Sequence, residues 1–262
     1  MKLTGNTIFI TGGGSGIGRA LAEALHVRGN KVIISGRRRA NLDEVVAANP
    51  GMEAVELDVT DPKSIDAVAA RLIADHPDLN VLINNAGIML PDRAAGRIDD
   101  KLAVETVTTN LLGPIRMTSA LVEHLKGKKG AVIAYTGSVL GFVPMAVTAV
   151  YSATKAAVHS FTQSLRVQLK NTHVKVFELA PPGTDTALFR GDFTEEDVKG
   201  VTPMDVATLA KHAIDGMSKD VYEIRPGLAN ALKLMSRVAP QFILRQLSKS
   251  ADNMLSQSKS QP

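Results

Sequence analysis

Short β-prone runs alternate with helix-prone segments along most of this 262-residue chain, and the alternation constrains its fold more than any other feature. A strand–helix repeat at this spacing implies right-handed crossovers and a parallel sheet covered by helices on both faces. We therefore expect an α/β chain, with a three-layer, doubly wound parallel sheet of about seven strands and a C-terminal helical tail. The expected strands are residues 7–11, 31–35, 54–57, 80–83, 131–135, 174–179 and 221–224.

A glycine-rich turn follows the first expected strand and leads into a helix expected from about residue 17 to residue 27. Residues 12–18 read GGGSGIG, so the glycines are spaced Gly-x-x-x-Gly-x-Gly. Glycines in such a turn let the backbone approach a pyrophosphate at the N-terminus of a helix. A tight loop without a ligand is the alternative, but the place directly after the first strand favours nucleotide binding. The candidate residues are Gly12, Ser15, Gly16, Ile17 and Gly18.

The second expected strand leads to Gly36, and three arginines follow, of which Arg37 and Arg38 are the candidates. NAD-binding proteins usually place an Asp or Glu near this point to bind the ribose 2′-hydroxyl, and that acid would repel a 2′-phosphate. An arginine can instead bind the phosphate through charge-assisted hydrogen bonds. A solvated basic loop is the alternative. Together with the glycine turn, the arginines predict NADP(H) as cofactor.

Small and polar residues follow three more of the expected strands. In a parallel sheet the carboxyl ends of the strands gather at one edge, where open α/β folds bind ligands. Amides at this edge could merely satisfy turn backbone, but they could also line the nicotinamide side of a site. The candidates are Asp58, Val59, Asn85, Ala86, Gly87, Pro181, Gly183 and Thr184.

Three residues near the middle of the chain can perform chemistry together. Tyr151 and Lys155 lie four apart in a helix expected over 151–169, so they share one face. A free phenol has a pKa near 10, and a nearby ammonium favours the phenolate, so Lys155 should lower the pKa of Tyr151. Ser138, just past the fifth strand, can hold a substrate oxygen while Tyr151 exchanges a proton with it. The pattern suits carbonyl/alcohol interconversion, although a Tyr-x-x-x-Lys pair alone could be coincidental.

Two helices are expected at 99–112 and 115–126, with a break at Gly113-Pro114. Asn110 lies inside the first helix, where its side chain would need a side-chain or water partner.

Residues 185–201 have weak periodicity and are expected to form a mobile loop with a short helix over the cofactor.

The composition excludes several functional classes. The chain has no cysteine, which excludes disulfides, thiolate catalysis and cysteine metal sites and suits a reducing compartment. The six histidines show no ligand spacing, so no metal site is expected. We see no signal segment and no run that could span a bilayer, so a cytoplasmic location is expected.

The charge is concentrated in the tail. Residues 225–262 hold six Lys or Arg and one Asp, whereas the whole chain carries +4, so the body has almost no net charge and nucleic acid is not expected as a partner. Apolar residues recur in the tail at nearly helical spacing, and Pro240 should kink or split that helix. We expect residues 1–227 to form the catalytic domain. Residues 228–262 should form a helical extension packed on it or on a partner subunit rather than on a membrane.

Together these motifs identify a family. The glycine turn, Asp58, Asn84-Asn-Ala-Gly87, Asn110, Ser138, Tyr151-x-x-x-Lys155 and Pro182-Gly-Thr184 occur in the order typical of short-chain dehydrogenases/reductases. The first 225 residues or so resemble the short, single-domain form of that family, which implies a Rossmann-type fold and a homodimer or homotetramer. Within the resemblance, Gly137 stands where the family often has a second Ser. The tail, with its run MSRVAP, is similar to a subgroup named for D-alanine esterification of teichoic acids, a name that assigns no reaction.

The resemblance implies a role for each matched residue. Tyr151 would be the general acid or base, Lys155 would lower its pKa and hold the nicotinamide ribose, and Ser138 would orient the carbonyl. Asn110 would support a proton relay through water. Gly12, Gly16, Ile17 and Gly18 would contact the pyrophosphate, Asp58 and Val59 the adenine, Asn85 the ribose, Thr184 the nicotinamide amide or phosphates, and Arg37 the 2′-phosphate.

We therefore interpret the chain as an NADPH-dependent reductase of ketones or aldehydes, reversible in principle. Its substrate side is expected to be apolar, which favours an apolar or aromatic carbonyl compound. A non-catalytic NADP(H) sensor on the same fold remains an alternative, because fold does not fix function. An NAD-dependent dehydrogenase working oxidatively is another. The residues expected to line the substrate side are Ile88, Met89, Leu90, Val139, Leu140, Phe142, Met145, Leu188 and Phe189.

Overall fold

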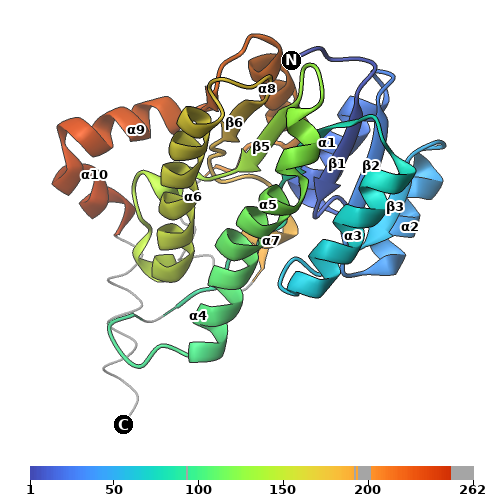
Figure 1. Ribbon diagram of the computed structural model, residues 1–262. Coiled ribbons are helices and arrows are strands. Elements are labelled where there is room, and N and C mark those ends of the chain that lie inside the picture. Colours follow the sequence, from blue (N-terminus) through green and yellow to red (C-terminus); the bar gives the residue numbers. More distant parts are fainter. Residues whose placement is uncertain (93, 192, 194–201, 249–262) are drawn as a thin grey trace.

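The computed structural model describes residues 1–262 except 93, 192, 194–201 and 249–262 (Figure 1). At its centre lies a seven-stranded sheet, parallel throughout, in the order β3-β2-β1-β4-β5-β6-β7. The chain runs outward from β1 to β3 and then crosses back to β4, so its direction of winding reverses between β1 and β4. Ligands bind at this kind of reversal in open α/β sheets. The strands are β1 (Thr7–Thr11), β2 (Lys31–Gly36), β3 (Glu53–Glu56), β4 (Leu79–Asn84), β5 (Val132–Thr136), β6 (Lys175–Leu179) and β7 (Glu223–Ile224).

Helices cover both faces of the sheet, which confirms the expected three layers (Figure 1). One layer contains α1 (Gly16–His26), α2 (Arg39–Ala48) and α8 (Val206–Ser218). The other contains α3 (Pro62–Asp75), α5 (Gly113–Lys126) and α6 (Ala149–Gln168), with α4 (Asp100–Val107) beside α6. Successive strand residues point to opposite faces, and in β1 Ile8 and Ile10 enter the first core while Phe9 enters the second. Each such fully buried side chain stabilises the fold by about 1.5–3 kcal/mol.

The expected helix break at Gly113-Pro114 is wrong. The chain passes from α4 through one π-helical turn, Thr108–Leu112, directly into α5. The N–H of Gly113 bonds back to the carbonyl of Thr108, and Pro114, which has no N–H, lies in the first turn of α5. The wider turn thus accommodates a proline within a continuous helix. Such turns are frequent at functional sites, and this one contains Asn110.

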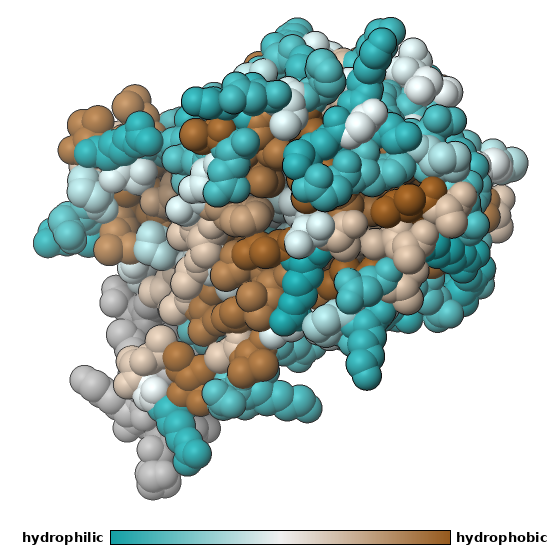
Figure 2. Space-filling model, in the orientation of Figure 1, coloured by the Kyte–Doolittle hydropathy of each residue, from teal (hydrophilic) through white to brown (hydrophobic). Residues whose placement is uncertain are grey.

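Two helices at the C-terminal end extend from the body of the molecule (Figure 1). They are α9 (Ala229–Val238) and α10 (Pro240–Leu247), and Pro240 occupies the first turn of α10, so the expected split is confirmed. Figure 2 shows brown, apolar side chains on this pair of helices. Leu228, Leu234, Val238 and Phe242 are exposed there. None of the described helices is long and apolar enough to cross a membrane.

The segment expected to cover the site is described only in part. A short helix, α7 (Ala187–Arg190), follows Thr186, whose hydroxyl accepts a hydrogen bond from the N–H of Phe189. Most of the remaining segment, 192 and 194–201, lies outside the described residues, as does the polar end of the tail from 249 onward.

Candidate active site

A cavity of about 460 Å³ opens at the carboxyl edge of the sheet, where the strand order reverses. Residues from the ends of β1, β2, β4 and β5 and from helix α6 form its walls. Most of the residues expected to bind a cofactor are among them. They are Gly12, Ser15, Gly16, Ile17, Arg37, Arg38, Asp58, Val59, Asn85, Ala86, Gly87, Tyr151, Lys155 and Pro181.

The glycine turn is packed too closely for side chains. Gly12 has φ +68°, and a Cβ on it would lie 2.8 Å from the Cα of Ala86. A Cβ on Gly18 would lie 2.2 Å from the carbonyl oxygen of Gly12. The turn therefore holds β1, the β4 loop and the start of α1 in backbone contact. As a result, the N-terminus of α1, at Ser15 and Gly16, borders the cavity as a site for an anion.

Two arginines enter the wall of the cavity directly after β2. Arg37 is 57% exposed and lies 3.9 Å from a carboxylate oxygen of Glu105, a separation at which it can still bind another anion. Arg38 is exposed at the start of α2. Arg39, by contrast, pairs with Asp43 at 2.8 Å. The end of β2 thus presents cations to the cavity and no carboxylate of its own.

Asn85 joins the ends of three strands. Its amide nitrogen donates to the carbonyls of Thr11 and Gly12, each at 3.2 Å, and its amide oxygen accepts from the hydroxyl of Thr136 at 3.1 Å. The Asn85 side chain therefore fixes the edge of the sheet besides lining the cavity.

Asp58 forms hydrogen bonds within its own loop, because one of its carboxylate oxygens accepts from the N–H and the hydroxyl of Thr60 at 2.9 and 2.8 Å.

Tyr151 and Lys155 lie on one face of α6 and reach the cavity together. The Lys155 Nζ donates to the carbonyl oxygen of Thr136 at 2.8 Å and lies 5.5 Å from the centre of the Tyr151 ring. Ser138 follows β5, and its hydroxyl accepts from the N–H of Leu140 at 3.1 Å and lies close enough to Tyr151 to affect the pKa of the phenol. The structure thus brings the three predicted residues together from β5 and α6.

Burial changes the acidity of both groups on α6. It raises the pKa of Tyr151 to about 12, and the nearby Ser138 hydroxyl acts in the opposite direction. Burial also lowers the pKa of Lys155 to about 8, and the charge of Glu178 acts in the opposite direction. The lowering that we expected from Lys155 is not found, because the pKa of Tyr151 responds to burial and to Ser138 and not to Lys155. At neutral pH the phenol is therefore protonated, the form that can donate a proton.

Asn110 lies behind the cavity and is 1% exposed. Its amide oxygen accepts from the N–H of Ile88 at 2.9 Å, and its amide nitrogen donates to the carbonyl of Ile88 at 2.8 Å. The nitrogen also reaches the hydroxyl of Thr154 at 3.3 Å. These contacts tie the loop after β4 to the π turn and to α6, so the side chain supports the site from behind.

Several expected residues contribute without forming the cavity wall. Gly18, Asn110, Ser138, Gly183 and Thr184 are not among the residues that line it, and Thr184 is buried with its hydroxyl donating to the carbonyl of Pro182 at 2.9 Å. Sequence reasoning missed Thr136 and Thr186, which do line the cavity. The only sequence signal for either was a hydroxyl next to a strand end or a short helix.

Nine residues were expected on the substrate side. Met89, Leu90, Val139 and Phe189 line neither the cavity nor its neighbour, and the other five divide into three groups. Ile88 and Leu188 line the cavity. Leu140 and Met145 line a neighbouring apolar pocket of about 260 Å³, which Leu244 of α10 also lines. Phe142 packs elsewhere, edge-to-face on His159 at 4.8 Å between ring centres.

The model of the short chain dehydrogenase family matches residues 6–197 of this chain. The chain belongs to that family. Its relative DltE of Bacillus subtilis (strain 168), named an uncharacterized oxidoreductase, is 35% identical over 250 residues, which are 94% of this chain and 98% of the relative. The sequence resemblance is thereby confirmed, and the chain is an oxidoreductase of this family.

Solved structures of the family superpose well on the chain. A short chain dehydrogenase from Burkholderia cenocepacia J2315 in complex with NADP is 26% identical, with a TM-score of 0.82, and the match covers 94% of this chain and 99% of that one. A 3-ketoacyl-(acyl-carrier-protein) reductase from Brucella melitensis complexed with NADH is 27% identical, with a TM-score of 0.77, and the match covers 84% and 94%. The family members thus bind NADP in one case and NADH in another.

Proposed function

We propose that this chain reduces a ketone or aldehyde to an alcohol with NADPH, and that Tyr151 is the general acid. The observation that carries the proposal is that Tyr151 and Lys155, with Ser138 close to Tyr151, line the same cavity as the glycine turn and two arginines. A general acid must be held within reach of the oxygen that it protonates, beside a group that orients that oxygen. These residues offer both functions in one place.

The cavity fits a nicotinamide dinucleotide that carries a 2′-phosphate. Side chains at Gly12 and Gly18 would clash with backbone, so the turn keeps the start of α1 open for a pyrophosphate. Arg37 and Arg38 suit a 2′-phosphate, because an arginine binds phosphate through paired, charge-assisted hydrogen bonds. When bound, the nicotinamide supplies the hydride.

The protein's own groups carry the proton. The Ser138 hydroxyl orients the carbonyl oxygen, and Tyr151, protonated at neutral pH, donates to that oxygen as negative charge develops on it. The nearby Lys155 ammonium stabilises the phenolate that remains. In the reverse direction the same phenolate takes the proton back from an alcohol.

The walls suggest the class of substrate. Ile88 and Leu188 are apolar residues that line the cavity. Burying an apolar substituent against these side chains would be favourable. We therefore propose an apolar or aromatic carbonyl compound as substrate.

A panel of carbonyl compounds tests this function. The purified protein is mixed with NADPH or NADH and each compound, and the loss of nicotinamide absorbance is followed. We expect reduction of at least one apolar ketone or aldehyde, faster with NADPH than with NADH. A protein that binds NADPH tightly but turns over no compound in either direction would instead be a sensor. A protein that prefers NADH would overturn the cofactor assignment.

A further inference from the structure

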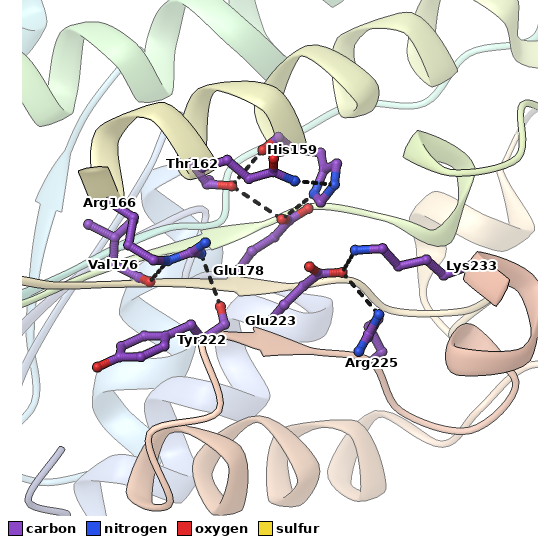
Figure 3. Close-up of polar contacts among 10 residues, drawn as sticks. His159, Thr162, Arg166, Val176, Glu178, Tyr222, Glu223, Arg225 and Lys233 are labelled. Atoms are coloured by element: carbon purple, nitrogen blue, oxygen red, sulfur yellow. Dashed lines mark hydrogen bonds and ion pairs between the residues drawn. The ribbon is translucent and has the colours of Figure 1, made fainter. Parts of the chain in front are cut away.

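Glu178 on β6 is a buried carboxylate directly behind the candidate active site. It is 1% exposed. One of its oxygens, Oε2, accepts from the His159 ring at 2.7 Å and from the Thr162 hydroxyl at 3.2 Å (Figure 3). The other, Oε1, is buried without a hydrogen-bond partner among the described residues. A buried carboxylate is costly unless it is compensated, so its position calls for an explanation.

The unpartnered oxygen lies against Gly137. A Cβ on Gly137 would be 2.6 Å from Oε1 and 3.3 Å from the Cγ atom of Glu178. The N–H of Gly137 meanwhile donates to the carbonyl of Leu179 at 2.7 Å, so the backbone cannot move away without losing this bond. The carboxylate therefore occupies the space that a side chain at residue 137 would need. This accounts for a glycine where related proteins often have serine.

Lys155 contacts the same stretch of backbone. Its ammonium donates to the carbonyl of Thr136, the residue before Gly137, at 2.8 Å. The Thr136–Gly137 peptide thus has the ammonium on its carbonyl and the Glu178 carboxylate against its glycine. Lys155 and His159 are also one helical turn apart on α6, so both approach β6 from the same face of the helix. The charge of Glu178 raises the pKa of Lys155, which burial alone would lower further.

The neighbouring cations are committed to groups other than Glu178. Glu223 on β7 is aligned with Glu178 in the sheet, and the two lie side by side (Figure 3). Glu223 is paired with Lys233 of α9 and with Arg225, whose guanidinium lies 3.4 Å away. The guanidinium of Arg166 is bonded to the carbonyls of Val176 and Tyr222.

Within the part of the chain that the structure describes, two titratable partners therefore remain for Glu178, both on α6. These are His159, in direct contact, and Lys155, which is bonded to the carbonyl of the residue before Gly137. The Tyr151 phenol is the titratable group that stands next to Lys155.

We propose that Glu178 is a positioning residue whose carboxylate, held by His159 and Thr162, is the buried counter-charge of the Lys155 ammonium, and that residue 137 is glycine to make room for it. The role in turnover rests on the proposed function. The electrostatic relationship is a property of the protein alone and can be measured without a substrate.

The test is the titration of Lys155 itself. Protein labelled with ¹³C at the lysine Cε is titrated by NMR, and the Lys155 signal is identified by its loss in Lys155→Met. In Glu178→Gln, which keeps the shape and removes the charge, the midpoint should move to lower pH by roughly half a unit or more. Glu223→Gln is the matched control: it removes an equal charge from the adjacent strand and should leave the midpoint in place. An unchanged midpoint in Glu178→Gln, or equal shifts in both variants, overturns the proposal.

Two further measurements keep the proposal testable if Glu178→Gln folds poorly. In the wild type, the ¹³Cδ shift of Glu178 should be that of a carboxylate at pH 7, and a protonated Glu178 there would overturn the proposal. Gly137→Ala should lower the melting temperature in the wild type and lower it less in a Glu178→Ala background, because the carboxylate that it meets is gone. An equal loss in both backgrounds would contradict the packing relationship.

Turnover gives a separate readout once a substrate is known. Loss of the counter-charge should move the alkaline limb of the pH–rate profile to lower pH in Glu178→Gln and not in Glu223→Gln. If the NMR midpoint moves but the pH–rate profile does not, the electrostatic pair is real and the proposed catalytic role of Lys155 is wrong.

Discussion

The Oδ2 atom of Asp92 accepts a hydrogen bond from the N–H of Val150 at 2.8 Å, one residue before Tyr151. The N–H of Asp92 in turn donates to the carbonyl of Val147 at 2.9 Å, and the residue is 5% exposed. The carboxylate therefore satisfies one of the free N–H groups in the first turn of α6 and complements the positive end of its dipole. It fixes the start of the helix at the turn that carries the candidate acid.

Removing this carboxylate should loosen the start of α6. We expect Asp92→Ala to lower the free energy of unfolding by about 0.5–2 kcal/mol, the usual range for losing an N-terminal cap. Asp92→Asn keeps an acceptor and should lose less. Urea unfolding of the three proteins measures this, with Asp61→Ala, which removes the cap of the distant helix α3, as a comparison. If turnover falls in Asp92→Ala and not in Asp61→Ala, the cap also orients Tyr151. Equal stability of Asp92→Ala and wild type would contradict the capping role.

Tyr151→Phe removes one oxygen and should reduce turnover by on the order of a hundredfold or more, the range for losing a positioned acid or base. Cofactor affinity should change little. The matched control is Tyr222→Phe, which makes the same change at a residue directly before β7 that is 41% exposed. This variant should keep normal turnover. Near-normal rates in Tyr151→Phe, with any accepted carbonyl compound, would refute the assignment of Tyr151.

Arg37→Ala combined with Arg38→Ala should weaken NADPH binding and leave NADH binding nearly unchanged. The loss of charge-assisted hydrogen bonds to a phosphate costs about 1.5–3 kcal/mol, or roughly ten- to a hundredfold in the dissociation constant. Arg39→Ala removes the neighbouring arginine, which is already paired with Asp43 at 2.8 Å, and should have little effect. Calorimetric titration gives the constants. A parallel loss for both nucleotides would mean that the arginines do not recognise the 2′-phosphate.

The buried Lys155 should make stability depend on pH in a specific direction. Burial lowers its pKa from 10.5 to about 8, so between these two values the unfolded chain holds a proton that the folded chain has released. The free energy of unfolding therefore rises as the pH increases through that window, by at most about 3 kcal/mol. Below the window Lys155 is charged in both states, and the full cost of burying that charge lowers the stability. Lys155→Met should be more stable than wild type at pH 7, and the difference should shrink by pH 9.5. Urea unfolding at both values checks this, and a gap that stays constant would contradict the shifted pKa.

Much of the fold followed from local pattern, because β-branched runs and the alternation of elements are written in the sequence. All seven strands were expected within a residue or two of their observed bounds, and the split at Pro240 was foreseen. The break expected at Gly113-Pro114 was wrong, because a proline in the first turn of a helix and one that ends a helix look alike in sequence. In the structure a π turn, Thr108–Leu112, leads directly into α5 with Pro114 in its first turn.

The candidate site was predictable where a backbone constraint produces a motif, as at Gly12 and Gly18. The site was not predictable where a residue's role depends on side chains from other strands or helices. Gly137 is explained only by the Glu178 carboxylate on the next strand, and Phe142 was expected at the substrate but packs on His159. The acidity of Tyr151 was also misjudged, since the sequence places Lys155 beside it but does not give the depth of burial that raises its pKa.

Helix α9 should depend on one buried cation for its attachment. The Lys233 side chain is 9% exposed, its ammonium is bonded to Glu223 and lies 4.8 Å from the centre of the Phe142 ring. Burial alone would raise the pKa of Glu223, but Lys233 and Arg225 hold it below its ordinary value, so the carboxylate stays charged and needs its partner. Lys233→Ala should therefore speed amide exchange in 229–238 by roughly ten- to a hundredfold, equivalent to about 1.4–2.8 kcal/mol, while protection of the central strands is kept. Arg237→Ala, an exposed cation on the same helix, is the control. Equal effects of the two changes, measured by hydrogen exchange with mass spectrometry, would mean that the apolar contacts alone hold α9.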